Sequence, residues 1–229
     1  NHDWYDGLTS FVRIFCQPKR WIGAWQVRQR RSYFSLRLGH GFWLWGVDLA
    51  TSDDFDAPQL EYFRHQAEEL GANDQVILCV PKPAWSERDV KVNGRLAADE
   101  DSWTSWSKIE TVRDLVTKAN HGASVPMVVA GDLHHYARHE ATDPGAQYIT
   151  CGGGGAFMLG TSSVPEKVRL TGDQTAEKRA IFPPLKASND MRSGVYKLFY
   201  RHKLFCLAMA AVQMGLVWFF QAASYDMQL

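Results

Sequence analysis

The sequence predicts an α/β protein. Buried strand-like runs alternate with amphipathic helical segments along the first two thirds of the chain. A group of histidines follows one of these strands directly, and the carboxyl end of a strand is where α/β folds place their sites. Near the end of the chain, an apolar run without formal charge is long enough to cross a bilayer.

The charges of the chain cancel. The 229 residues include 25 Lys and Arg and 25 Asp and Glu, so no global field attracts nucleic acid, and we expect no nucleic-acid partner. The densest basic run is "RQRR" at residues 28–31. Such a run is either a phosphate-contacting patch or a solvated surface segment.

A β-hairpin is predicted between residues 34 and 49. Phe34, Leu36 and Leu38 alternate with polar residues, and the glycines on either side of His40 indicate a turn. The return strand, residues 42–49, is apolar at successive positions. We therefore expect it to be covered on both faces.

Two helices and three further strands follow. Asp56 and Gln59 form a capping box with Pro58 in the first turn, which predicts a helix ending near Leu70. The second helix carries one apolar stripe, formed by Trp106, Ile109, Val112, Val116 and Ala119. Buried strands are predicted for "QVILCV", "VPMVVAG" and "QYITC".

The chain divides into three predicted parts. Residues 1–165 form the α/β domain, and residues 166–196 are a polar linker or extended loop, because prolines and charges replace the periodicity there. Residues 197–229 contain the uncharged run 204–223, which is either a transmembrane helix or an apolar helix packed against the domain. Basic residues precede this run and only Asp226 follows it, so the α/β domain is expected on the cytoplasmic side of a membrane.

The segment "GDLHHYARH" carries the residues best suited to chemistry. Asp132, His134, His135 and His139 are four potential metal ligands within eight residues, directly after a predicted strand. A carboxylate with imidazoles suits Mn²⁺, Fe²⁺ or Zn²⁺. The glycine run at residues 152–155 is interpreted as either a phosphate cradle or a tight turn beneath the site.

Five elements follow one another in an order that resembles a known family. They are "NHD" at residues 1–3, "LWGVDL" with the helix "PQLEYF", "VILC" ending in prolines, "GDLHHY", and "ITCGGGGAF". Over residues 1–165 this order resembles the calcineurin-like metallophosphoesterases, and it is most similar to their large membrane-associated bacterial and plant members. The resemblance implies an αββα sandwich of two mixed sheets, here lacking its N-terminal strands because the chain starts inside the Gly-Asn-His-Asp motif.

The resemblance also implies roles for five residues. Asn1 is an amide ligand of a second metal, His2 stabilises or protonates the leaving oxygen, and Asp3 orients His2. His134 is a ligand of the first metal, and Asp132 occupies the place of the family's penultimate histidine, where a carboxylate also ligates. Two divalent ions (manganese, iron or zinc) are therefore expected.

The sequence departs from the family at one ligand. Where the family has a lone histidine after a strand, the chain reads "CVPKPAW", and neither Val80 nor Pro81 can coordinate a metal. Lys82 would repel a nearby metal or, alternatively, stabilise a phosphate as a point charge.

The expected function is therefore hydrolysis of a phosphoester or pyrophosphate by a metal-activated water. The substrate is expected to be a phosphorylated small molecule or a lipid-linked phosphate. The hydrolysis is expected of the intact protein, and this chain on its own is expected to be inactive. The alternative is a degenerate phosphoesterase domain that acts as a membrane-tethered binding or scaffolding module.

Overall fold

An eight-stranded mixed sheet is the main feature of the computed structural model, in the order β11-β12-β9-β10-β8-β5-β4-β3. The structure describes residues 4–49, 55–87, 91–92, 95–96, 100–119, 122–142, 145–154 and 157–226. The strands of the sheet are β3 (Phe34–Gly39), β4 (Phe42–Gly46), β5 (Gln75–Val80), β8 (Ser124–Ala130), β9 (Tyr136–Ala141), β10 (Gln147–Cys151), β11 (Lys167–Arg169) and β12 (Thr175–Phe182).

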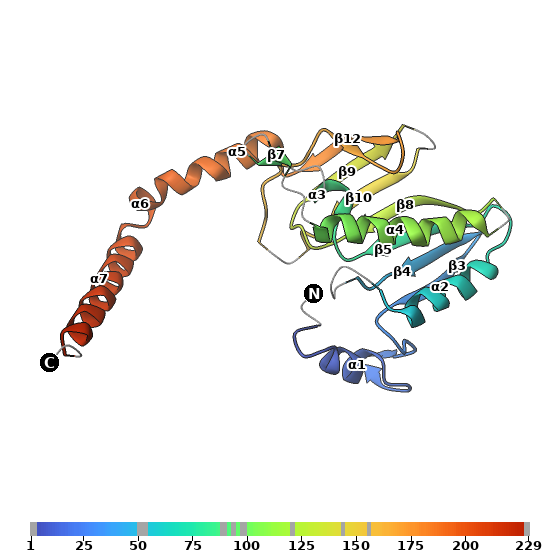
Figure 1. Cartoon of the computed structure of the whole chain (residues 1–229), viewed down its shortest axis with the longest axis horizontal. Helices are drawn as coiled ribbons and strands as arrows, with labels where there is room; N and C mark the ends of the chain where they lie inside the picture. The colour runs from blue at the N-terminus through green and yellow to red at the C-terminus, as the bar shows by residue number, and fades with distance from the viewer. Residues whose placement is uncertain are drawn as a thin grey trace.

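Helices and two short hairpins complete the chain (Figure 1). The hairpins are β1 (Trp21–Ile22) with β2 (Trp25–Gln26), and β6 (Lys91–Val92) with β7 (Arg95–Leu96). The helices are α1 (Thr9–Phe15), α2 (Ala57–Glu68), α3 (Ala84–Glu87), α4 (Glu100–Lys118), α5 (Leu185–Gly194), the 3₁₀ turn η2 (Val195–Lys197), α6 (Leu198–Arg201) and α7 (Lys203–Asp226).

The strand directions define one functional edge. β4, β5, β8 and β10 run parallel to one another, whereas β3 pairs antiparallel with β4, β9 with β10, and β12 with both β9 and β11. The carboxyl ends of β4, β5, β8 and β10 therefore meet at one edge. This arrangement confirms the predicted α/β class.

The helices α2, α3 and α4 bury one face of the sheet. Trp45 of β4 packs against Phe63 of α2, with 5.1 Å between the ring centroids. Tyr148 of β10 contacts Trp85 of α3 at 5.5 Å and Trp106 of α4 at 6.1 Å. Full burial of a large apolar side chain contributes about 1.5–3 kcal/mol, so these contacts are the main source of stability for the domain.

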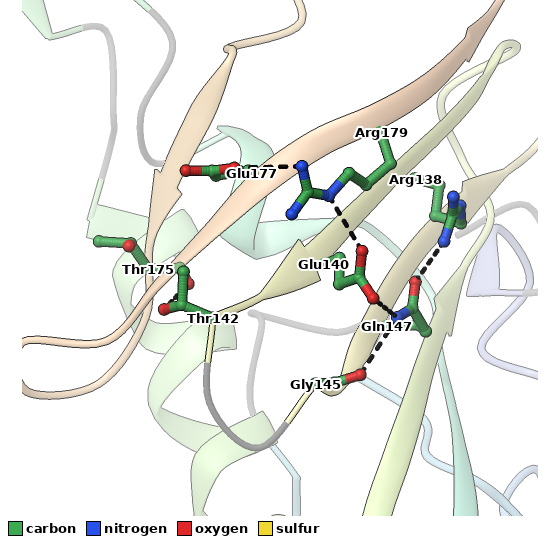
Figure 2. Close-up of polar contacts among 8 residues, drawn as sticks. All are labelled: Arg138, Glu140, Thr142, Gly145, Gln147, Thr175, Glu177 and Arg179. Atoms are coloured by element: carbon green, nitrogen blue, oxygen red, sulfur yellow. Dashed lines mark hydrogen bonds and ion pairs between the residues drawn. The ribbon is translucent and has the colours of Figure 1, made fainter.

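The opposite face of the sheet is less covered. Its middle is apolar and half-buried, with Leu44, Ile77, Met127, Val129 and Ile149. Towards β12 the same face becomes charged (Figure 2). Glu140 accepts hydrogen bonds from Gln147 (3.1 Å) and Arg179 (2.9 Å). Arg138 donates to Gln147 at 2.8 Å. This network links β9, β10 and β12 side by side.

Several predicted elements are confirmed. The hairpin β3–β4 turns through Gly39, His40 and Gly41, all with positive φ. The Asp56 carboxylate accepts a hydrogen bond from the Gln59 amide at 2.9 Å, as its predicted capping role requires.

Other expectations need correction. β11, β12 and α5 lie within the segment that was expected to be a linker or loop, so that part of the expectation is wrong, while the division into domains stays a prediction. β4 is not covered on both faces, because Leu44 is half-buried and Phe42 is 38% exposed. In the part of the chain that the structure describes there is one large sheet, where the resemblance implied two.

The C-terminal helices extend away from the sheet (Figure 1). Thr161 holds the start of α5, because its hydroxyl donates to the carbonyl of Pro183 (2.8 Å) and its amide donates to Ser188 Oγ (2.9 Å). Within α7, Lys203–Ala222 has a mean hydropathy of 1.8 and none of it is buried in the protein. By length and composition this helix can cross a membrane.

Candidate functional site

Polar residues occupy equivalent positions after three parallel strands. Asp48 lies two residues beyond β4, Lys82 two residues beyond β5, and Asp132 two residues beyond β8. Because these strands are parallel neighbours, all three residues belong to the same edge of the sheet. This edge is where the sequence placed the site.

The turn after β8 is tight. The Leu133 amide donates to the Gly131 carbonyl at 2.8 Å, and the His135 amide donates to the Leu133 carbonyl at 2.7 Å. Between them, Asp132 has a φ of 63°, in the left-handed region that a non-glycine residue enters at a cost of about 1–2 kcal/mol. Its side chain is exposed, so the strained backbone presents the carboxylate to solvent.

Gly152, the first residue of the glycine run, packs directly against the backbone of this turn. A Cβ atom on Gly152 would overlap the Leu133 carbonyl oxygen, so only glycine allows the two backbones to approach so closely. Further along, the Leu159 amide donates to the His134 carbonyl at 2.9 Å. This supports the interpretation of the run as a close approach beneath the site.

His134 is half-buried with one unsatisfied ring nitrogen. Its ring meets that of Phe157 edge-on, at 4.6 Å between centroids. Its Nδ1 atom is buried, and no hydrogen-bond partner is found for it in the described part of the chain. Buried polar atoms are rarely left unpaired, but ring nitrogens of His135 and His139 also lack a partner among the described residues, so the unpaired Nδ1 does not by itself distinguish His134.

The other two histidines of the motif turn away from the edge. His139 shares one face of β9 with Ala137 and Ala141. It is fully buried on this helix-covered face, where its Nε2 lies 2.9 Å from the Pro165 carbonyl oxygen. Burial lowers the pKa of His139, and burial together with the neighbouring His139 lowers the pKa of His135. Both histidines are therefore neutral core residues, and the structure does not bring His139 together with Asp132 and His134.

Asp48 lies at the same sheet edge and is a candidate site residue that the sequence did not single out. Its carboxylate accepts a hydrogen bond from Trp4 Nε1 at 3.2 Å. The Gln59 side chain clamps its backbone, accepting from the Asp48 amide at 2.8 Å and donating to its carbonyl at 2.9 Å. A cavity of about 410 Å³ lies here, lined by Trp4, Leu8, Tyr33, Asp48, Phe55 and Asp56. The position of an aspartate two residues beyond a strand was the available signal.

Only part of the predicted site is described. Asn1, His2 and Asp3 lie outside the described residues, whereas Asp132 and His134 are brought together by one turn. Trp4, the next residue after Asp3, contacts Asp48 at the same sheet edge. Within the described ranges no three His, Cys, Asp or Glu side chains are grouped to hold a metal ion, so these residues alone do not make a metal centre.

Comparisons with known proteins give structural neighbours only. No family model matches the chain, and no curated protein matches its sequence. Among solved structures, a purple acid phosphatase from yellow lupin (Lupinus luteus) seeds matches over 66% of this chain with 13% identity and a TM-score of 0.37. GAP50, the anchor in the inner membrane complex of Plasmodium, matches over 65% with 13% identity and a TM-score of 0.34.

Both structural matches are partial. The chain spans 27% of the lupin phosphatase chain and 44% of the GAP50 chain. Similarity at this level concerns the arrangement of the backbone and does not extend to activity.

Proposed function

We propose that the intact protein hydrolyses phosphoester or pyrophosphate bonds with a metal-activated water. The observation that carries this proposal is the turn after β8, where a strained backbone exposes the Asp132 carboxylate two residues before His134, whose Nδ1 has no partner among the described residues. Oxygen and imidazole ligands on one tight turn at a parallel-sheet edge suit a divalent cation. The family and the type of reaction are inferred from the order of the motifs in the sequence.

Residues 1–3 complete this proposal. Asn1, Asp132 and His134 would bind two divalent ions, either manganese, iron or zinc. When bound, these ions would supply an activated water and neutralise developing charge. His2 would donate a proton to the leaving oxygen near neutral pH, and Asp3 would hold its imidazole in the orientation for that transfer. The hydrogen bond between Trp4 and Asp48 supports their placement at this edge, because it anchors the residue that follows Asp3.

The second candidate function is a degenerate domain that binds or scaffolds at a membrane. Two observations favour it: Lys82 stands after β5 where the family has a ligand, and the described residues group no three metal-binding side chains. A folded protein that retains neither metal nor activity would support this alternative. Two equivalents of metal per chain would exclude it.

The wider architecture is part of the same proposal. A second sheet would pack on the half-buried apolar face of β4, β5, β8 and β10, as the resemblance implies. Oxidation of Met127 on that face would then be much slower than that of Met158, which is 49% exposed. The α/β domain would lie on the cytoplasmic side, because Lys197, Arg201 and Lys203 precede the apolar part of α7.

A phosphatase assay with added Mn²⁺ tests the reaction. His2→Ala is compared with the wild type and with His65→Ala, whose histidine is exposed on α2 and pairs with Glu61 at 3.2 Å. Loss of activity in His2→Ala, with a normal rate in His65→Ala, supports the proposal. Equal rates in the wild type and His2→Ala would contradict it. The substrates to compare are phosphorylated small molecules and lipid-linked phosphates.

A further inference from the structure

A second cavity lies away from the turn after β8. It has a volume of about 490 Å³ and is lined mainly by Arg28, Arg30, Arg31, Tyr33, Phe34 and Tyr62. The arginines come from the segment between β2 and β3, and Tyr62 comes from α2. This volume is within the range of small-molecule sites and several times that of a phosphate ion.

The charges around this cavity are uncompensated. Its described lining includes three arginines and no Asp or Glu. Some arginines elsewhere are paired with a carboxylate: Arg64 lies 3.4 Å from Glu61 and Arg179 lies 2.9 Å from Glu140. In the described ranges no carboxylate reaches ion-pair distance of Arg28, Arg30 or Arg31. Three guanidinium groups held around one cavity repel one another, and a bound anion would relieve that repulsion.

The aromatic rings hold one of these arginines in place. The Arg31 guanidinium carbon lies 4.8 Å from the Tyr62 ring centroid and 5.4 Å from that of Tyr33. The Ser35 amide donates to the Tyr62 hydroxyl at 2.9 Å, and Gln29 Nε2 donates to the Arg31 carbonyl at 2.7 Å. A guanidinium held against rings still has its in-plane N–H donors, which bind phosphate bidentately.

We propose that this cavity binds a phosphorylated aromatic compound. The phosphate dianion would pair with Arg28, Arg30 and Arg31, and the aromatic body would pack among the rings of Tyr33, Phe34 and Tyr62. A dianion balances three cations better than a single carboxylate does, and the aromatic lining fills the volume that phosphate alone would leave empty. This binding needs no metal ion and does not depend on the proposed hydrolysis.

Equilibrium dialysis of the full chain in phosphatidylcholine nanodiscs, with EDTA present, tests this proposal. The probes are adenosine monophosphate, adenosine and inorganic phosphate. The monophosphate is expected to bind at least about tenfold more tightly than either fragment, because both halves of the cavity then contribute. Equal binding of inorganic phosphate, or no binding of the monophosphate, would overturn the proposal.

Variants test the assignment of the residues. Arg28→Gln, Arg30→Gln and Arg31→Gln are each expected to weaken monophosphate binding by about tenfold or more, since each removes a charge-assisted hydrogen bond. Arg64→Gln removes an exposed arginine from the neighbouring helix and is expected to leave binding unchanged. All three arginines are exposed, and in the described part of the chain only Arg31 among them lies over aromatic rings. The Arg28 and Arg30 variants therefore report on binding even if Arg31→Gln disturbs the packing against Tyr33 and Tyr62. Unchanged monophosphate binding in both Arg28→Gln and Arg30→Gln would overturn the proposal.

Discussion

Two histidines five residues apart in the chain have opposite surroundings. His134 is half-buried at the carboxyl edge of the sheet with its ring edge-on to Phe157, and its Nδ1 atom, like that of His139, has no partner in the described part of the chain. His139 is fully buried under the helices with Nε2 against the Pro165 carbonyl. The alternation of β9 explains part of this difference, because His139 shares the covered face with Ala137 and Ala141. Proximity in sequence therefore does not define the site; the direction of the side chain does.

Replacing His134 should have the largest effect on activity. His134→Ala is expected to reduce phosphatase activity by about 100-fold or more, because even substitutions behind a metal ligand typically cost 10–100-fold. Stability should change by less than about 1 kcal/mol, since the ring is only partly buried. Steady-state kinetics with added Mn²⁺ checks the first effect and denaturant unfolding the second. Full activity in this variant would remove the distinction between the two histidines.

Replacing His139 should act on stability instead. His139→Ala is expected to lower the free energy of unfolding by about 2–4 kcal/mol, because it leaves a cavity and an unpaired carbonyl in the core. The exposed His65→Ala control should lie within about 0.5 kcal/mol of the wild type. Urea unfolding in a mild detergent measures both. Similar stabilities for the two variants would contradict the core assignment of His139.

The turn that presents His134 should be sensitive to one glycine. Gly152→Ala is expected to destabilise the protein by about 1–3 kcal/mol and to reduce activity, because the added methyl overlaps the Leu133 carbonyl and must displace the turn. At Gly154 an added Cβ would meet nothing within 4 Å, so Gly154→Ala is the matched control. Thermal melting and the Mn²⁺ assay together compare the two. Equal behaviour would show that the close approach is unimportant.

The lowered pKa of His139 gives a smaller effect that depends on pH. Burial lowers its folded-state pKa, so the unfolded chain binds a proton below about pH 6.5 while the folded protein does not. Stability is therefore fully present above that pH and is lost as the pH falls below it. His139→Gln should flatten the difference in unfolding free energy between pH 7.5 and pH 5.5. Parallel pH profiles for the wild type and the variant would contradict this.

The same strand shows what the sequence could and could not predict. The hairpin, α2 and α4 were predictable because caps and apolar stripes mark them. β9 reads "YARHEA", in which small residues and a histidine face the core and Arg138 and Glu140 face outward, so no apolar alternation was visible. Because no strand is predicted over these residues, the sequence groups His139 with the potential metal ligands. β12 was missed for the same reason, since its outward residues carry the charged network (Figure 2).

Within the site, the sequence predicted the position of Asp132 and His134 but not their local geometry. The left-handed backbone of Asp132 depends on the tight turn and on the glycine beneath it. Such strain arises from packing between segments distant in sequence and has no local signal. The contact between Trp4 and Asp48 is likewise tertiary, joining residues 44 positions apart.

The most direct test of the metal binding proposed for the turn after β8 is the metal content of Asp132→Gly. Glycine adopts the left-handed backbone without strain, so this variant should keep its stability or gain up to about 1 kcal/mol while losing the carboxylate. The purified wild-type protein is expected to retain manganese, iron or zinc, and the well-folded variant is expected to bind the metal at least about tenfold more weakly. Equal metal content and affinity in the two proteins would contradict the proposed metal binding.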